Sequence, residues 1–145
     1  MESLNYGVKT GLGLLPVHKT VEYHLADELP KIYDDTAIEQ IRYGLSELGH
    51  EILRHSDCTR VKVSTERHEA TQSVLIAWNG PHLAGDLVQR INDSYRIGAE
   101  SRSMPERHGT QIAGHWFGFV NGVVRIENYK DGIYRVRNVI EFILS

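Results

Sequence analysis

Two short elements of the chain each carry a histidine followed two positions later by a threonine. His18 and Thr20 lie near the N-terminus, and His108 and Thr110 lie 90 residues further along a chain of 145 residues. An imidazole can give or take a proton near neutral pH, and a hydroxyl group can donate a hydrogen bond to a phosphate oxygen. If the fold brought the two elements together, they could carry acid–base chemistry on a phosphate ester.

These elements resemble the paired motifs of two-histidine phosphoesterases. The resemblance implies that two strands present His18, Thr20, His108 and Thr110 to one phosphate, with one histidine acting as base and the other as acid. The implied substrates are cyclic or 2′,3′-linked nucleotides. The middle residue in that family is usually apolar, whereas Lys19 and a glycine stand here. The phosphoesterase is therefore kept as the alternative function.

The remaining histidines and glycines and the single cysteine complete no metal or cofactor site. His50 and His55 are five positions apart, which places the two imidazoles about 140° apart on a helix, too far to share a zinc ion. Gly11 and Gly13 lack the third glycine of a dinucleotide-binding loop. Cys58 has no second cysteine to pair with. The sequence predicts no metal, no cofactor and no closed catalytic set.

Hydrophobic periodicity predicts the elements that position these residues. The acidic pair Asp34 and Asp35 precedes a predicted helix, and Thr36 with Glu39 forms a capping-box pair at its start. Aliphatic residues spaced three and four apart give this helix one apolar stripe, made of Ile38, Ile41, Leu45, Leu48 and Ile52.

Alternation at period two predicts a β-hairpin next, with strands at 60–65 and 72–78. The second of these strands is apolar on both faces, which favours a central place in a sheet. A second helix is predicted to start at Pro81 and to stop at Gly98.

The C-terminal third is predicted to be a meander of strands at 115–120, 123–128 and 133–144. Asn121-Gly122 is a preferred two-residue hairpin turn between the first two strands. In the last strand one face is apolar and is interrupted only by Asn138.

The predicted fold class is therefore α+β, an antiparallel sheet of hairpin and meander with two helices and an N-terminal arm. Residues 34–145 are predicted to form a single domain. Residues 1–33 are predicted to be the arm, with one strand at 17–25.

Composition and charge narrow the classes of partner. The hydrophobic share of 41% is that of an ordinary globular chain. With 16 basic and 19 acidic residues the chain has no excess of positive charge, so nucleic acid is an unlikely partner. Its apolar runs are too short to cross a membrane, so we expect no membrane association and synthesis in the cytoplasm. Acidic residues gather in the first helix and arginines in the C-terminal third, a segregation that suits head-to-tail contacts between subunits.

The order of elements resembles that of tail-terminator and tail-completion proteins of tailed bacteriophages. The likeness spans residues 34–145 and includes the closing hairpin, in which Arg125–Asn128 leads through Lys130–Gly132 into Ile133–Val136 and then Ile140–Phe142. The resemblance implies a non-enzymatic virion protein that assembles as a homo-oligomeric ring, generally a hexamer. Its partners would be the tail tube and the head connector.

The leading prediction is thus a ring-forming tail terminator or head–tail joining protein, with no catalytic residues and a place in the virion. The alternative is the phosphoesterase. A ligand-sequestering binding module is a third class that the sequence leaves open.

Overall fold

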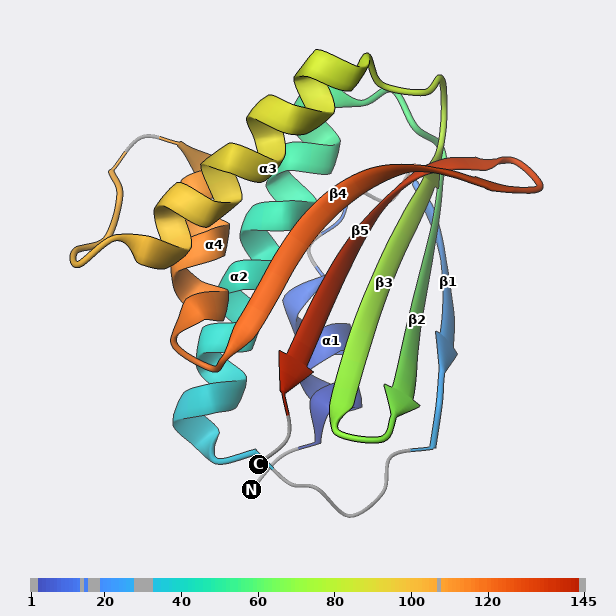
Figure 1. Cartoon of the computed structure of the whole chain (residues 1–145). Helices are drawn as coiled ribbons and strands as arrows, with labels where there is room; N and C mark the ends of the chain where they lie inside the picture. The colour runs from blue at the N-terminus through green and yellow to red at the C-terminus, as the bar shows by residue number, and fades with distance from the viewer. Residues whose placement is uncertain (1–2, 14, 16–18, 28–32, 107, 144–145) are drawn as a thin grey trace.

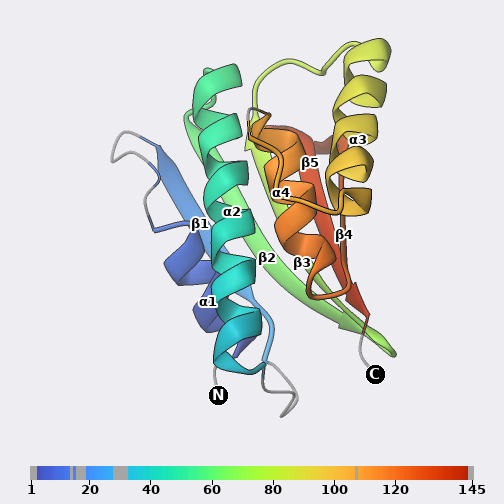
Figure 2. The ribbon, with the colours of Figure 1, turned by 90° about the vertical axis from the view of Figure 1, so that its left-hand side faces the viewer.

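The computed structural model describes residues 3–13, 15, 19–27, 33–106 and 108–143. Five strands form one sheet in the order β1-β2-β3-β5-β4, and the four helices of the described ranges lie on one face of it (Figure 1, Figure 2). The α+β class is confirmed. The helices number four rather than two, and the sheet is mixed because β1 runs parallel to β2.

The first 33 residues supply a helix and an edge strand to this fold. Helix α1 (Leu4–Gly11) begins where the Ser3 hydroxyl accepts a hydrogen bond from the Tyr6 amide at 3.2 Å. Strand β1 (Thr20–Leu25) lies within the predicted range 17–25, and positions 16–18 are outside the described residues. The apolar side chains of the helical segment are buried in the common core: Leu4, Val8 and Leu12.

Helix α2 (Asp35–His55) confirms the predicted apolar stripe, whose five members are at most 3% exposed. Its cap differs from the prediction. The carboxylate of Asp34 accepts a hydrogen bond from the Ala37 amide at 2.7 Å, so Asp34 is the N-cap and Thr36 lies inside the helix.

The predicted hairpin is observed as β2 (Arg60–His68) and β3 (Thr71–Asn79), and both strands are longer than predicted. The turn between them is tight because Glu69 adopts a positive φ of 48°. Strand β3 is central, as its two apolar faces predict, with β2 on one side and β5 on the other.

Helix α3 (Gly85–Glu100) starts four residues after Pro81, and Gly98 does not stop it. Gly98 instead lies where α3 crosses helix α4 (Gly109–Gly118). A Cβ at this position would overlap the backbone carbonyl of Gln111, and a Cβ at Gly114 would overlap the carbonyl of Tyr95. The two glycines therefore let the helix backbones touch.

The prediction of a strand at 115–120 is wrong, because this segment is the second half of α4 and the turn that follows it. Its aromatic residues serve helix packing rather than a sheet. Phe117 is fully buried over Gly44 of α2, where a Cβ would lie 2.6 Å from the Phe117 ring.

The C-terminal hairpin is confirmed as β4 (Gly122–Asp131) and β5 (Tyr134–Ile143). Strand β5 lies between β3 and β4, and its helix-facing side carries Val136, Asn138, Ile140 and Phe142, all buried. No helix in the described part of the chain is long and apolar enough to cross a membrane.

Candidate functional site

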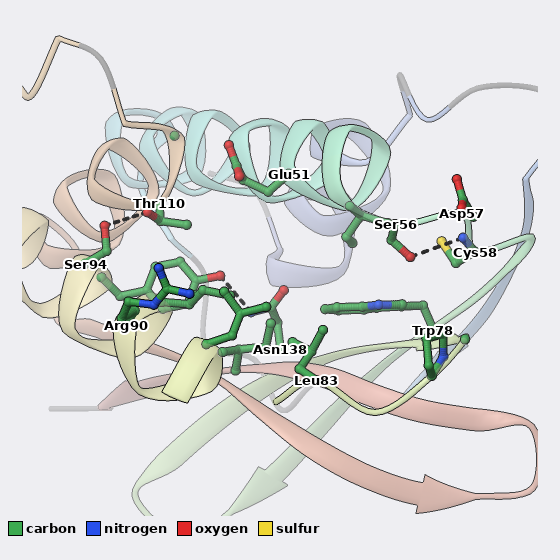
Figure 3. A pocket seen from close by; sticks show the side chains of 18 of the residues that line it. Glu51, Ser56, Asp57, Cys58, Trp78, Leu83, Arg90, Ser94, Thr110 and Asn138 are labelled. Carbon is green, nitrogen blue, oxygen red and sulfur yellow. Dashed lines mark hydrogen bonds between the residues drawn. The ribbon is translucent and has the colours of Figure 1, made fainter. Parts of the chain in front are cut away.

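A cavity of about 890 Å³ lies between the sheet and helices α2, α3 and α4. Its walls come from the end of α2, the loop after β3, one face of α3, the first turn of α4 and three strands (Figure 3). These segments are far apart in the sequence, so no single local motif specifies the cavity. The cavity exists because α3 and α4, which cross closely, cover the half of the sheet that α2 leaves open.

The sheet side of the cavity is apolar and aromatic. Trp78 and Ile126 line it from β3 and β4 and are 6% and 5% exposed. In Figure 3 the Trp78 side chain extends along the cavity toward Asn138. Tyr95 and Leu83 complete this part of the wall. A flat aromatic group could pack against this wall and lose water from the face that meets it.

One amide group interrupts the apolar wall. Asn138 is 2% exposed, and its side-chain nitrogen donates to the Tyr95 hydroxyl at 3.0 Å and to the Arg125 backbone carbonyl at 3.2 Å. Burial raises the pKa of the Tyr95 phenol far above its usual range, the Asn138 hydrogen bond opposes this rise, and the Glu51 carboxylate adds a smaller increase. Tyr95 is therefore a neutral hydroxyl at any physiological pH.

The other end of the cavity is polar and is built around the N-terminus of α4. The N-cap residue His108 makes no side-chain cap hydrogen bond, and Thr110 shares a 2.6 Å hydrogen bond with Ser94 of α3. A Cβ at Gly109 would overlap the carboxylate of Glu51, so that carboxylate lies directly against the first turn of α4. The backbone amides of a first helical turn attract anions.

The loop that follows β3 is held in place by two asparagines. The Asn79 side-chain oxygen accepts the amides of Thr59 and Arg60, each at 2.9 Å. The Asn128 side chain accepts the Leu83 amide at 2.8 Å and donates to the Leu83 carbonyl at 2.9 Å. The mouth of the cavity is thus a fixed edge rather than a loose loop.

The structure separates the sequence-predicted site residues. His108 and Thr110 line the cavity, whereas Thr20 begins the edge strand β1 and is not part of the wall. His18 lies outside the described residues. Lys19 is buried, and its ammonium group donates to the Cys58 carbonyl at 2.5 Å and lies 3.4 Å from the Cys58 sulfur. Within the described ranges no three side chains of the metal-binding types gather.

The sequence alone did not identify Glu51 and Trp78, which supply a carboxylate and an aromatic ring to the cavity wall. The spacing of charged residues along α2 does not mark Glu51 as a cavity residue, and Trp78 belongs to the strand whose two apolar faces predict only a central place in the sheet. The available signal was Asn138, a polar residue in the middle of an apolar strand face. A buried amide in such a place needs hydrogen-bonding partners, and Tyr95 is one of them.

No known protein family matches the chain by sequence, and no curated protein does. Solved structures do match. The mycobacterial sensor histidine kinase MprB has a TM-score of 0.70 at 14% identity over 97% of this chain and 93% of its own. The histidine kinase domain of the E. coli osmosensor EnvZ has a TM-score of 0.67 at 13% identity over 98% and 86%.

Full-length ShkA, solved in complex with AMPPNP, has a TM-score of 0.68 at 14% identity over 99% of this chain and 31% of its own. Together these matches define the class: the chain has the fold of histidine kinase catalytic domains. At this level of identity they show the fold alone.

The comparisons overturn the resemblance to phage tail terminators. The matching structures are histidine kinase domains. The predicted non-enzymatic ring in the virion, with tail tube and head connector as partners, is therefore wrong. The neighbours are enzymes of cellular signalling. The phosphoesterase alternative is contradicted by the same matches.

Proposed function

We propose that this chain is a nucleotide-binding domain of the histidine kinase type, which binds ATP in the cavity between the sheet and helices α2, α3 and α4. The observation that carries the proposal is the division of this cavity into an aromatic end and a helix N-terminus. These are the two environments that a nucleotide needs, one for its base and one for its phosphates. A protein of the same fold was solved with the ATP analogue AMPPNP.

The aromatic end suits the base. Trp78 and Tyr95 lie on the wall with Ile126 and are nearly fully buried. Burying a planar ring against such side chains removes apolar area from water at about 25 cal/mol per Å². The fixed loop at Leu83 closes one side of this region.

The first turn of α4 suits the phosphates. Its backbone amides lie at the positive end of a ten-residue helix, and Arg90 lines the cavity from α3. Glu51 lies against the same turn of α4. Without a bound cation, its negative charge would repel a polyphosphate.

The donor chemistry at this end fits a magnesium ion. Mg²⁺ is usually bound by one or two carboxylates together with substrate phosphates, and Glu51 is the carboxylate in the right position. Such an ion, when bound, neutralises phosphate charge. Glu51 would hold it, while α4 and Arg90 orient the phosphate chain.

The neighbours are named as histidine kinases, so we place the chain in the same reaction class. In that class the bond from the terminal phosphorus to its bridging oxygen breaks and a bond to an imidazole nitrogen forms, with ADP as the product. This chain would supply the bound nucleotide. The acceptor histidine would come from another segment that reaches the α4 end of the cavity.

Isothermal titration calorimetry with Mg·ADP and Mg·AMPPNP tests the proposal on the full chain. Arg90→Ala should weaken binding about threefold to fivefold, because Arg90 is exposed and its pairing with phosphate is screened by water. The matched control is Arg96→Ala on the same helix, since Arg96 is exposed, pairs with Asp93 and is not part of the cavity wall. Absence of binding, or an equal loss in both variants, would contradict the proposal.

A further inference from the structure

A second, much smaller cavity lies beside the β2–β3 turn, at the far end of the sheet from the loop that follows β3 (Figure 1). Its walls come from the first turn of α1, the end of β1, the end of β2 and the start of β3, and it shares no residue with the proposed nucleotide cavity. Its volume is about 10 Å³, which is room for one water-sized atom.

The β3 wall of this cavity carries the buried amide of Gln72. Gln72 is 2% exposed, and its side-chain oxygen accepts a hydrogen bond from the Tyr33 hydroxyl at 2.7 Å. The oxygen therefore faces Tyr33, and Nε2 of the same group faces away from it. This nitrogen is buried and has no hydrogen-bond partner in the described part of the chain. A buried donor without an acceptor costs free energy.

The β2 wall places a charged donor beside this amide. Arg67 lies directly opposite Gln72 in the β2–β3 ladder, so both side chains leave the sheet on the same face. Nη1 of Arg67 is also buried without a hydrogen-bond partner, and its side chain forms no ion pair within the described ranges. A buried guanidinium that lacks a negative partner is costly, because its charge has lost much of its contact with water.

The nearby polar groups are already used or lie elsewhere. The Thr65 hydroxyl donates to the Asn5 side chain at 3.0 Å and accepts the Ala26 amide at 2.9 Å. Glu66 also lines the cavity, but its carboxylate pairs with His68 at 3.1 Å. Two unpartnered N–H groups, one of them positively charged, therefore converge on a space of one atom.

We infer that Arg67 and Gln72 bind a single-atom anion, with chloride as the probe. The guanidinium supplies the charge, and the two N–H groups supply the hydrogen bonds. Phosphate and sulfate carry four oxygens and are too large for this volume. The ion would join α1 and β1 to the β2–β3 hairpin and so stabilise the fold. Glu66 and Asp27 at the cavity oppose the anion, so we expect millimolar affinity.

The direct test is ³⁵Cl NMR of sodium chloride solutions that contain the full chain. Chloride that exchanges with a protein site has a broader resonance, and the broadening should rise with protein concentration and be reversed by bromide. Arg67→Gln should remove most of this broadening. The matched control is Arg60→Gln, because Arg60 is an exposed arginine on the same strand and lines neither cavity.

Thermal unfolding measures the stabilisation. Chloride at about ten times its dissociation constant should raise Tm by about 3–6 °C relative to gluconate at equal ionic strength, because gluconate is too large for the cavity. Gln72→Glu places a carboxylate opposite Arg67. This variant should have a higher Tm than the wild type in gluconate, and chloride should no longer raise it.

The outcomes decide between an anion and a water molecule in this cavity. Equal Tm in chloride and gluconate, together with no ³⁵Cl broadening, would overturn the inference. Equal broadening in the wild type and Arg67→Gln would place the chloride elsewhere and would also overturn it. The result for Arg67→Gln decides the question even if Gln72→Glu does not fold. Nucleotide binding in the larger cavity is independent of all these outcomes.

Discussion

Replacing Gly98 by alanine should push helices α3 and α4 apart. A Cβ at Gly98 would overlap the backbone carbonyl of Gln111. A backbone carbonyl within a helix cannot turn aside as a flexible side chain can. The helices must therefore separate, and with them the cavity walls at Tyr95 on α3 and Thr110 on α4.

The magnitude follows from the kind of contact. Extra atoms in a packed core cost typically about 1–3 kcal/mol, and contact with backbone places Gly98→Ala at the upper end. Alanine stabilises a helix by about 0.5–1 kcal/mol relative to glycine, which offsets part of this cost. We expect a net loss of about 2 kcal/mol, which for a domain of this size lowers Tm by about 4–8 °C.

Thermal and urea unfolding followed by circular dichroism measure this loss. The matched control is Gly85→Ala at the start of the same helix, where an added Cβ would meet no atom within 4 Å. This variant should unfold at or slightly above the wild-type midpoint. If Gly98→Ala unfolds at the wild-type midpoint, α3 and α4 are not in the backbone contact described here.

Three further predictions follow from single contacts. Asp34→Ala should lower the free energy of unfolding by about 1 kcal/mol in urea, because it removes the 2.7 Å cap on the Ala37 amide; an unchanged midpoint would refute this. Because burial raises the pKa of Tyr95, only the unfolded chain ionises this phenol just above pH 10. Below pH 10 the contribution of Tyr95 to the free energy of unfolding should therefore be fully present. Above pH 10 the free energy of unfolding should fall more steeply than in Tyr95→Phe, by up to about 1.4 kcal/mol per pH unit, and equal slopes would contradict this. Chelation of Mg²⁺ should weaken ADP binding in the wild type but much less in Glu51→Gln, and calorimetry with and without EDTA would detect the difference.

Local periodicity predicted the elements whose partners lie nearby in sequence. The stripe of α2 and the alternation in β2 and β5 follow from one buried face each, and the apolar run of β3 follows from two; both patterns are properties of the segment itself. Helix α4 could not be predicted in this way. Gly109, Gly114 and Gly118 lower its intrinsic helix propensity, and Gly114 is there to let α3 approach, a need that only the tertiary structure reveals.

The site was less predictable than the fold. Its walls come from segments that are far apart in the chain, and the order of elements does not show that β5 inserts between β3 and β4. The resemblance to phage tail terminators rested on this order of elements alone, and the order does not specify how the strands pair. Asn138 was visible as the polar interruption of an apolar face, but its partner Tyr95 is 43 residues away.

The central claim is that a nucleotide occupies the cavity between the sheet and helices α2, α3 and α4. The most direct measurement is a titration of the ¹⁵N-labelled chain with Mg·ADP, followed by two-dimensional NMR. We predict that the largest shifts fall on the backbone amides of Gly80 and Thr110 and on the side-chain amide of Asn138, all of which line the cavity. The account would be contradicted by an unchanged spectrum at millimolar nucleotide, or by shifts confined to the β2–β3 turn at Glu69.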